Sequence, residues 1–424
     1  MKSQIQSVKG TREFYPESMA VRRWLYHLIE EVSNSFGYLE YDGPFIEKID
    51  LYAAKSGEEL VKEQAFVFAD RGGDLITLRP ELTPSLARMI AAKQNELIFP
   101  LRWWSFGPFW RYEKPQKGRS REFFQWNIDL IGTNSPEADA EIIGICATLL
   151  KKAGINPQQI QIKINHRKLI EKKLEEAGIP LTKKVEVFHL IDRMDKLGHE
   201  DWLKSASEIG LDDQQIANIV ILINNQELWK ESPELVRIFE VLEYLGVGEY
   251  VSYDPRIIRG LDYYTGTVFE AWDVGGDGRA VLGGGHYDNL VADVGGNPLA
   301  GVGFAMGDVM ITLLMKKYGC LPDLHLQDDT VLVSVFDYQT FPVAARFSSY
   351  LRNEGIKVIL YPEIEKLQKQ IRFADRSGIR LVIVLGPDEA EKAQVSIKNL
   401  RDHTQVTLPQ EIAPGVIREM LASQ

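Results

Sequence analysis

A guanidinium, a carboxylate and two phenols precede a strand-like segment in the stretch RGLDYYTGTVFEAW. Thr267 to Trp272 are rich in β-branched and aromatic residues, which is typical of a strand. The polar side chains at the mouth of this strand are Arg259, Asp262, Tyr263 and Tyr264. Charged groups placed where a buried strand begins need a physical reason, and ligand binding is one such reason.

Similar polar groups occur near the ends of three other strand-like segments. Each of them alone is more typical of a salt-bridged or surface residue, so only their combination is informative. They are Arg79 and Glu81 in LRPELTP, Arg111 and Glu113 in FWRYE, and Gln125 and Asp129 in QWNIDLIG.

Other kinds of chemistry have little support in the sequence. The glycine-rich stretches DVGGDGRAVLGGGHYD and GVGFAMGD match neither a P-loop nor a Rossmann turn, so we expect their glycines to serve close backbone approach. Nucleophile motifs of the Ser/His/Asp or Cys/His kind are missing. The seven histidines have no zinc-ligand spacing, so no metal site is expected from protein clusters, and Cys146 and Cys320 are expected to be reduced core residues.

Size and charge narrow the class of protein. The chain has 424 residues and a mass of 48.2 kDa, which predicts two or three domains. Its net charge of −11 disfavours broad attraction to nucleic acid, although the run RYEKPQKGRSRE has five basic residues against two acidic ones. The start has no apolar signal segment and no run reaches the ~18 apolar residues of a membrane span, so a cytoplasmic protein without membrane contact is expected.

The order of periodic segments predicts an α+β protein with three regions. Helical periodicity at 17–36, 83–95 and 136–153 is mixed with strand-like segments in hairpin-like groups, which indicates an antiparallel sheet. Residues 167–245 are almost wholly helical and are interpreted as an insertion. From residue 328 short apolar strands alternate with helices at 341–354 and 366–378, which predicts a small α/β domain of parallel type.

Several blocks, taken together and in order, resemble the histidyl-tRNA synthetases, a family of class II aminoacyl-tRNA synthetases. FWRYEKPQKGRSREFFQ resembles motif 2 of that class, while RGLDYYTGTVFE and LGGGHYDNLV resemble two histidine-specific signatures. VKGTREFYP, TLRPELTP and the C-terminal KLQKQIRFADRSGIRLVIVLGPDE match further blocks. The resemblance implies a class II antiparallel-sheet catalytic domain at 1–327, with the helical insertion at about 167–245, and an α/β anticodon-binding domain at 328–424.

The resemblance implies activation of L-histidine with ATP to histidyl-adenylate, followed by transfer of histidine to tRNA(His). The substrate carboxylate attacks the α-phosphorus, so fixed cations near that centre lower the barrier. Arg111 and Arg259 match the two family positions that act there. ATP enters with Mg²⁺, and the positions that match adenine contacts are Glu113 at the amino group and Phe123 at the ring face.

The family's remaining functional positions can be carried over one at a time. Tyr264, Tyr287 and Asp129 match the residues around the imidazole, with Tyr263 beside them, and Glu81, Thr83 and Gln125 match those that bind the α-amino group. The family more often has glutamate at position 129, so the shorter aspartate leaves room for a bridging water. Gln116 and Arg121 match positions that contact the tRNA acceptor end, and Pro44 in YDGPFIE matches motif 1, which implies a C2 homodimer.

One departure keeps an alternative open. GVGFAMGDVMI stands in the place of motif 3, and Val309 and Met310 occupy the positions of its glutamate and arginine. A broken site would favour a catalytically inactive synthetase-like regulatory subunit of ATP phosphoribosyltransferase. Because Arg111 and Arg259 remain, we expect an active enzyme in which Met310 is an apolar lid and a basic residue elsewhere, or Mg²⁺, meets the γ-phosphate.

Overall fold

The structure is a computed structural model that describes residues 5–53, 63–114, 116, 118–194, 197–258, 263–276, 279–324 and 326–423. The chain divides into two compact units, of which the first consists mainly of Val21–Leu321 and the second mainly of Pro322–Gln424. Among the helices of the described residues, none is both long and apolar enough to cross a membrane.

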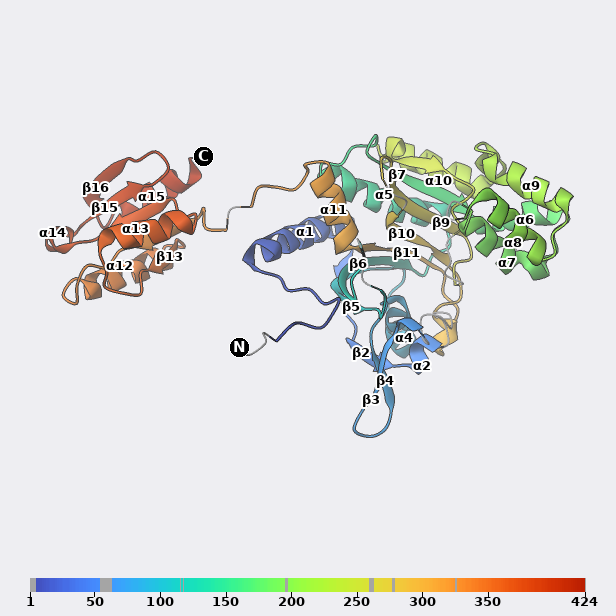
Figure 1. Ribbon diagram of the computed structural model, residues 1–424, viewed down its shortest axis with the longest axis horizontal. Coiled ribbons are helices and arrows are strands. Elements are labelled where there is room, and N and C mark those ends of the chain that lie inside the picture. The colour runs from blue at the N-terminus through green and yellow to red at the C-terminus, as the bar shows by residue number, and fades with distance from the viewer. Residues whose placement is uncertain are drawn as a thin grey trace. The chain divides into compact units, whose positions relative to one another are not determined.

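The first unit is built on an eight-stranded sheet (Figure 1). Its strands, in spatial order, are β1 (Leu39–Glu40), β5 (Leu101–Trp110), β6 (Glu122–Ile131), β11 (Gly301–Gly307), β10 (Ala280–Tyr287), β9 (Thr267–Asp273), β7 (Ile160–His166) and β8 (Val251–Tyr253). All pairs from β5 to β7 are antiparallel, and only the outer pairs β1–β5 and β7–β8 are parallel. The predicted antiparallel sheet is confirmed.

Strand β6 shows how the sequence separates the two faces of this sheet. Successive side chains of a strand point to opposite faces. Its apolar residues Trp126, Ile128 and Leu130 belong to the main hydrophobic core, and the alternating residues Gln125, Asn127 and Asp129 line a cavity on the other face. One face therefore supplies stability, and the opposite face is free to hold polar groups.

Helices cover the apolar face and part of the other one. α1 (Pro16–Ser35), α5 (Pro136–Lys152) and α11 (Asp308–Lys317) contribute to the main core, whereas α4 (Thr83–Lys93) packs on the opposite face in a smaller core (Figure 1). Helix α5 begins as predicted, because the Ser135 side chain accepts a hydrogen bond from the Ala138 backbone N–H. A small antiparallel sheet of β2 (Ile46–Lys48), β4 (Leu75–Leu78) and β3 (Phe66–Ala69), with α2 (Asp50–Ala53), lies beside α4.

The predicted helical region is found between β7 and β8. Its helices are α6 (Arg167–Glu176), α7 (Lys184–Asp192), α8 (His199–Glu208), α9 (Asp213–Asn224) and α10 (Pro233–Tyr244). Helix α10 packs against α5, so its buried face joins the main core. In Figure 1 the remaining helices of this region, in green, gather beyond the edge of the sheet that ends in β8.

The second unit has its own sheet and its own core. Its strands are ordered β13 (Lys357–Leu360), β12 (Thr330–Val333), β14 (Leu381–Val384), β15 (Gln394–Asn399) and β16 (Gln405–Pro409), with helices α12 (Phe341–Asn353), α13 (Leu367–Arg376), α14 (Pro387–Glu391) and α15 (Ala413–Ala422). The parallel-type prediction is only half right, because β14–β15 and β15–β16 are antiparallel. Five residues join β15 to β16, and such a short connection permits only a hairpin.

Candidate active site

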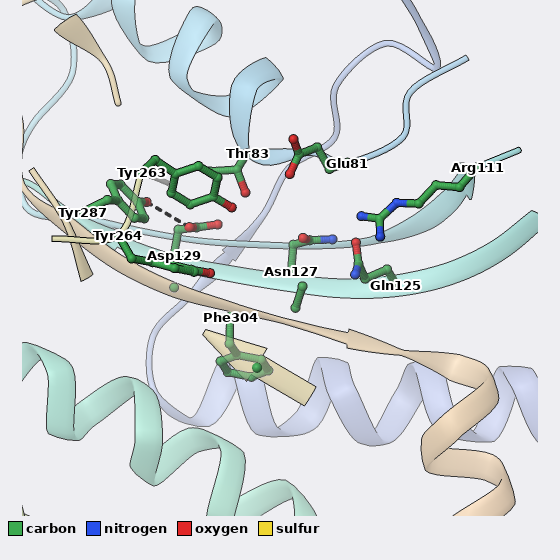
Figure 2. Close-up of a pocket in the computed structure, with 13 residues that line it drawn as sticks. Glu81, Thr83, Arg111, Gln125, Asn127, Asp129, Tyr263, Tyr264, Tyr287 and Phe304 are labelled. Carbon is green, nitrogen blue, oxygen red and sulfur yellow. Dashed lines mark hydrogen bonds between the residues drawn. The ribbon is translucent and has the colours of Figure 1, made fainter. Parts of the chain in front are cut away.

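A cavity of about 210 Å³ opens on the polar face of the large sheet. Figure 2 shows three tyrosines around Asp129 at one end and the Arg111 guanidinium at the other. The predicted residues that line it are Glu81, Thr83, Arg111, Gln125, Asp129, Tyr263, Tyr264 and Tyr287. The structure thus brings together eight side chains from separate parts of the chain.

Asn127 also lines this cavity, although it was not among the residues predicted from the sequence. The residue is 4% exposed, and its Nδ2 is buried without a hydrogen-bond partner among the described residues. A buried donor that has no protein partner costs free energy unless a ligand or water accepts from it. The period-two alternation with Gln125 and Asp129 would have identified it. Phe304 and Ala305, which also line the cavity, were not predicted, and Gly283 and Gly303 were expected only to allow close backbone approach.

Asp129 and Tyr287 form the polar centre of the tyrosine end. The Tyr287 hydroxyl donates to Asp129 Oδ1 at 2.9 Å, and both residues are buried. Burial raises the pKa of Asp129 to about 7, and the hydrogen bond from Tyr287 opposes this rise. The Tyr263 ring meets Tyr287 edge to face at 6.3 Å and lies 4.8 Å from the Tyr264 ring. The carboxylate is therefore held by one hydroxyl inside an aromatic wall.

The glycines around this end allow close approach, as predicted. A Cβ on Gly303 would lie 2.2 Å from Asp129 Oδ1, and one on Gly301 would lie 2.8 Å from Tyr287 Cε2. Such distances are far below van der Waals contact. Neither β11 position tolerates a side chain while Asp129 and Tyr287 keep these places.

Arg111 marks the other end of the cavity. Its Nε donates to the Pro80 carbonyl oxygen at 2.9 Å, and its guanidinium lies 5.4 Å from the centre of the Phe123 ring. Within the described part of the chain Arg111 forms no ion pair, so its charge is not neutralised by a carboxylate. A second cavity, of about 140 Å³, shares Arg111 with the first and is lined by Glu113, Phe123 and Met310 among others.

Glu113, which we expected to bind the adenine amino group, has a protein partner in this structure. Its Oε2 lies 2.7 Å from Arg119 Nη1 in an ion pair between a half-exposed and a more buried side chain. A ligand amino group can still bind this carboxylate at either oxygen, because an ionised carboxylate offers about four acceptor positions.

Asp308 fixes the start of α11 beside the second cavity. Its Oδ1 accepts from the Phe124 backbone N–H at 2.9 Å, and its Oδ2 pairs with Arg12 Nη1 at 2.9 Å. This contact ties α11 to β6 and to the N-terminal block VKGTREFYP. Met310 is thereby held at the wall of the same cavity as Phe123.

The two residues expected at the tRNA acceptor end have different surroundings. Gln116 is exposed and forms an isolated backbone bridge with Arg119. Arg121 packs its guanidinium 3.9 Å from the Tyr112 ring centre and donates to the carbonyl oxygens of Glu113 and Lys9. Arg121 therefore also braces the loop against the N-terminal segment.

Arg259 lies outside the described residues, as does Asp262. Within the described ranges, no group of three or more His, Cys, Asp and Glu side chains gathers closely enough to hold a metal ion. Of the two cysteines, both free, Cys146 is buried and Cys320 only partly so, which corrects the expectation that both are core residues. The Cys320 thiol reaches the Gly154 carbonyl oxygen at the edge of the core.

Comparison with known proteins decides the family. The profile of the family described as histidyl-tRNA synthetase matches residues 10–309, and that of an anticodon binding domain matches residues 329–420. The chain belongs to the histidyl-tRNA synthetase family.

Curated relatives extend this result over nearly the whole chain. A histidine–tRNA ligase of Haloarcula marismortui is 36% identical over 96% of this chain and 97% of its own length. A chloroplastic/mitochondrial histidine–tRNA ligase of Arabidopsis thaliana is 35% identical over 94% of this chain and 84% of its own length.

Solved structures of the histidyl-tRNA synthetase family share the fold. The crystal structure of histidyl-tRNA synthetase from Nostoc sp. PCC 7120 is 25% identical, with a TM-score of 0.83 over 99% of this chain and 100% of that one. A Bacillus halodurans structure, described as an ATP phosphoribosyltransferase regulatory subunit/histidyl-tRNA synthetase, is 22% identical with a TM-score of 0.74 over 91% of this chain and 99% of that one. At that identity it shows the fold alone.

This histidyl-tRNA synthetase family member carries a buried histidine directly behind the tyrosine end. His286 precedes Tyr287 on β10 and points to the helix-covered face, where its Nδ1 lies 2.8 Å from Asp139 Oδ1 of α5. Its Nε2 lies 3.3 Å from Asp288 Oδ1. Burial alone would lower the pKa of His286, but the hydrogen bond and the charges of both aspartates raise it overall.

We expect this histidine to make stability depend on pH. A histidine with a raised folded-state pKa stabilises the fold fully below about pH 6.5, and this contribution is lost as pH rises through the folded-state pKa. The free energy of unfolding lost in His286→Asn should therefore be larger at pH 6 than at pH 9. Urea denaturation of both proteins at the two pH values measures this. An equal loss at both would contradict a charged His286.

Proposed function

We propose that the protein is a histidyl-tRNA synthetase, which activates L-histidine with ATP and transfers the histidyl group to tRNA(His). The observation that carries the proposal is the first cavity, which has a buried carboxylate and tyrosines at one end and, at the other, an arginine that forms no ion pair with any described residue. An amino acid that reacts through its carboxylate has its side chain and its reacting group at opposite ends. It therefore needs side-chain contacts at one end of the cavity and a positive charge at the other.

The imidazole is proposed to lie at the tyrosine end. An imidazole presents a donor and an acceptor in one plane, so Asp129 accepts from one nitrogen while Tyr264 completes the pairing from the adjacent wall. The Asp129 contact is direct or runs through one water. Glu81 and Gln125, with Thr83, bind the α-ammonium group, for which a carboxylate is the natural partner.

The carboxylate and the α-phosphate are proposed to meet at Arg111. The pinned guanidinium stabilises negative charge as the carboxylate oxygen bonds to the α-phosphorus and pyrophosphate leaves. Arg259 acts on the same centre in this proposal, which for that residue rests on its motif alone. The Asn127 amide, close to the same point, can donate to the substrate carboxylate.

Adenine is proposed to occupy the second cavity. Phe123 offers a ring face for stacking, and Glu113 accepts from the adenine amino group once it releases or shares Arg119. Mg²⁺ enters with ATP as its phosphate complex, since this ion is commonly held by substrate phosphates with few carboxylates.

The tRNA is proposed to meet both units. Gln116 and Arg121 serve the acceptor end from the loop between β5 and β6, and the anticodon-binding domain, residues 328–424 within the second unit, serves the anticodon. The helices of residues 167–245 belong to the catalytic domain, residues 1–327, as an insertion. A cytoplasmic C2 homodimer completes the proposal, and the exposed apolar side chains of Phe45 and Ile46 next to Pro44 support it.

Histidine-dependent exchange of pyrophosphate into ATP tests the proposed activity. Wild-type protein should catalyse exchange with histidine and not with other amino acids. A regulatory subunit without activation chemistry would give none. The retained Arg111 and the match of the second unit to an anticodon binding domain both favour the enzyme. No exchange at saturating ATP and Mg²⁺ would overturn it.

Removal of residues 328–424 should separate the two half-reactions. The two units have separate hydrophobic cores, so the first should keep its fold and its histidine activation. The KM for tRNA should rise about tenfold or more, because losing contacts worth about 1.4 kcal/mol already gives that factor. Exchange, aminoacylation and light scattering of the truncated protein measure this, and the dimer should persist. Parallel loss of both activities in a folded protein would contradict a separable module.

A further inference from the structure

Strand β7 ends next to the segment that carries two of the tyrosines, residues 263–266, which we call the tyrosine segment. Arg167, the first residue of α6, is buried, and its Nη1 donates to the Tyr264 carbonyl oxygen at 2.8 Å. Its backbone N–H donates to the Gly266 carbonyl oxygen at 3.0 Å. One residue therefore binds the tyrosine segment at two backbone positions.

Asn165 holds the chain that comes before the tyrosine segment. The residue is fully buried, and its Nδ2 donates to the carbonyl oxygens of Pro255 and Ile257, at 3.0 Å each. Its Oδ1 accepts from the His166 backbone N–H at 2.8 Å, which fixes the orientation of the amide. Ile257 packs in the same small core as Tyr264. Asn165 thus supports the aromatic wall of the first cavity through packing.

The Tyr264 ring has little freedom while its backbone is held. A Cβ on Gly285 would lie 2.7 Å from Tyr264 Cδ1, so the ring lies directly on the backbone of β10. The centre of the Tyr263 ring is 4.8 Å from that of the Tyr264 ring. Because Tyr264 lines the cavity, a shift of its backbone would move the ring relative to a ligand bound there.

The Arg167 guanidinium is confined as well. It lies 5.1 Å from the centre of the Phe188 ring of α7, which belongs to the helical region between β7 and β8. Burial of a guanidinium costs desolvation free energy, and an apolar side chain of similar volume is often at least as stabilising in such a place. The contacts with the tyrosine segment therefore explain a charge at this position better than stability does.

We propose that Arg167 and Asn165 are positioning residues for histidine binding, which act by holding Tyr264 against the imidazole. The inference rests on the proposed function, in which the imidazole lies between Asp129 and Tyr264. Hydrogen bonds weaken steeply when their distance and angle depart from the preferred geometry. A displaced Tyr264 should therefore weaken histidine binding, whereas the ATP end of the site, marked by Arg111, should keep its affinity.

The first test compares Arg167→Met with Arg167→Lys. Methionine fills similar space without a donor, so the dissociation constant for histidine should rise about tenfold or more, the factor for one lost hydrogen bond from a charged group. Lysine can still donate to the Tyr264 carbonyl oxygen and should recover part of the affinity. Calorimetry without ATP measures histidine binding, and the KM for ATP in pyrophosphate exchange should stay near wild type.

A double-mutant cycle shows whether Arg167 acts through Tyr264. In the Tyr264→Phe background the phenol hydroxyl is already absent, so Arg167→Met should raise the dissociation constant for histidine only slightly further. Losses that add in full would mean that Arg167 does not act through this tyrosine, and they would overturn the inference.

Gln161 provides the matched control for Asn165. It lies on the same strand, and its amide also donates to two carbonyl oxygens, those of Pro157 at 3.0 Å and Glu249 at 2.9 Å. Neither acceptor belongs to the tyrosine segment or to the small core. Asn165→Ala should weaken histidine binding, and Gln161→Ala should leave it unchanged. Unchanged binding in Asn165→Ala would remove that residue from the proposal.

Unchanged histidine binding in a folded Arg167→Met protein would overturn the inference, as would equal weakening by Gln161→Ala. A rise in the KM for ATP as large as the loss of histidine affinity would indicate general distortion and would also overturn it. Melting temperatures verify folding, and Arg167→Gln and Asn165→Ser replace variants that do not fold. If the wild type itself binds no histidine, the proposed function fails, which is a separate result.

Discussion

Arg111→Gln should lower kcat for histidine activation by about 10²- to 10³-fold, the usual cost of removing one preorganised donor from a developing charge. The guanidinium is pinned by the Pro80 carbonyl oxygen and lies beside Phe123, so it needs no rearrangement when the phosphorus is attacked. Glutamine keeps a polar side chain of similar reach but removes the charge. Pyrophosphate exchange at saturating histidine and ATP measures the effect.

A control variant and a binding measurement test whether the loss of kcat is specific to the charge of Arg111. Arg102→Gln makes the same change on β5, where the side chain pairs with Glu141 at 2.9 Å and does not line the cavity, so activity should persist. Histidine affinity of Arg111→Gln, measured by calorimetry without ATP, should change far less than kcat, because the charge that Arg111 meets develops in the transition state. A variant with near-normal kcat would remove Arg111 from the chemistry.

The sequence predicts the sheet and much of the cavity because both depend on local alternation. On β6 the residues Gln125 and Asp129 were identified from their motif, and the same period of two places Asn127 between them on the same face. Asn127 was missed because an isolated asparagine gives no chemical signal. The alternation gives its position, and its role emerges when burial shows that its amide nitrogen has no hydrogen-bond partner in the described part of the chain.

The sequence could not distinguish a structural arginine from one that faces the cavity, because long-range contacts decide this. Arg79 stands in the same kind of motif as Arg111, yet it is fully buried, with Nη1 2.5 Å from Asp42 Oδ1 and Nε donating to the Pro108 carbonyl oxygen. Its charge is therefore structural, while Arg111 faces a cavity. Partners 29 and 37 residues away decide the difference, and no local pattern encodes them.

Asp129→Asn should weaken histidine binding by about 10²-fold at pH 8, because a charge-assisted hydrogen bond to the imidazole is lost and a buried polar group is left poorly paired. The penalty should be smaller at pH 6. With a pKa of about 7, the wild-type carboxyl is then mostly protonated and resembles the amide. Calorimetric titration of both proteins at the two pH values gives the ratio directly, and the titration of free histidine is the same in both experiments.

Asp129→Glu is the matched control for that change. It restores the carboxylate more often found in the family, one methylene longer, and should bind histidine within about tenfold of wild type, since the charge remains. The Tyr287 hydroxyl can donate to either carboxylate, and to the amide oxygen of asparagine. A pH-independent loss in Asp129→Asn would show that the carboxyl does not titrate near neutrality.

Asp129→Asn should also stabilise the ligand-free protein. A buried carboxyl whose pKa rises from 3.8 to about 7 binds its proton more tightly in the folded state, so stability falls as pH rises from about 4 to about 7 and stays low above that. Asparagine carries no such penalty.

The free energy of unfolding of Asp129→Asn should exceed that of wild type by about 1–3 kcal/mol at pH 8, since each pKa unit corresponds to about 1.4 kcal/mol, and the gain should shrink by pH 5. Urea denaturation without histidine measures both. If Asp129 is retained for ligand binding, the variant should be more stable than wild type and bind histidine less tightly. If the variant loses both stability and binding, the Asp129–Tyr287 pair serves mainly to stabilise the fold.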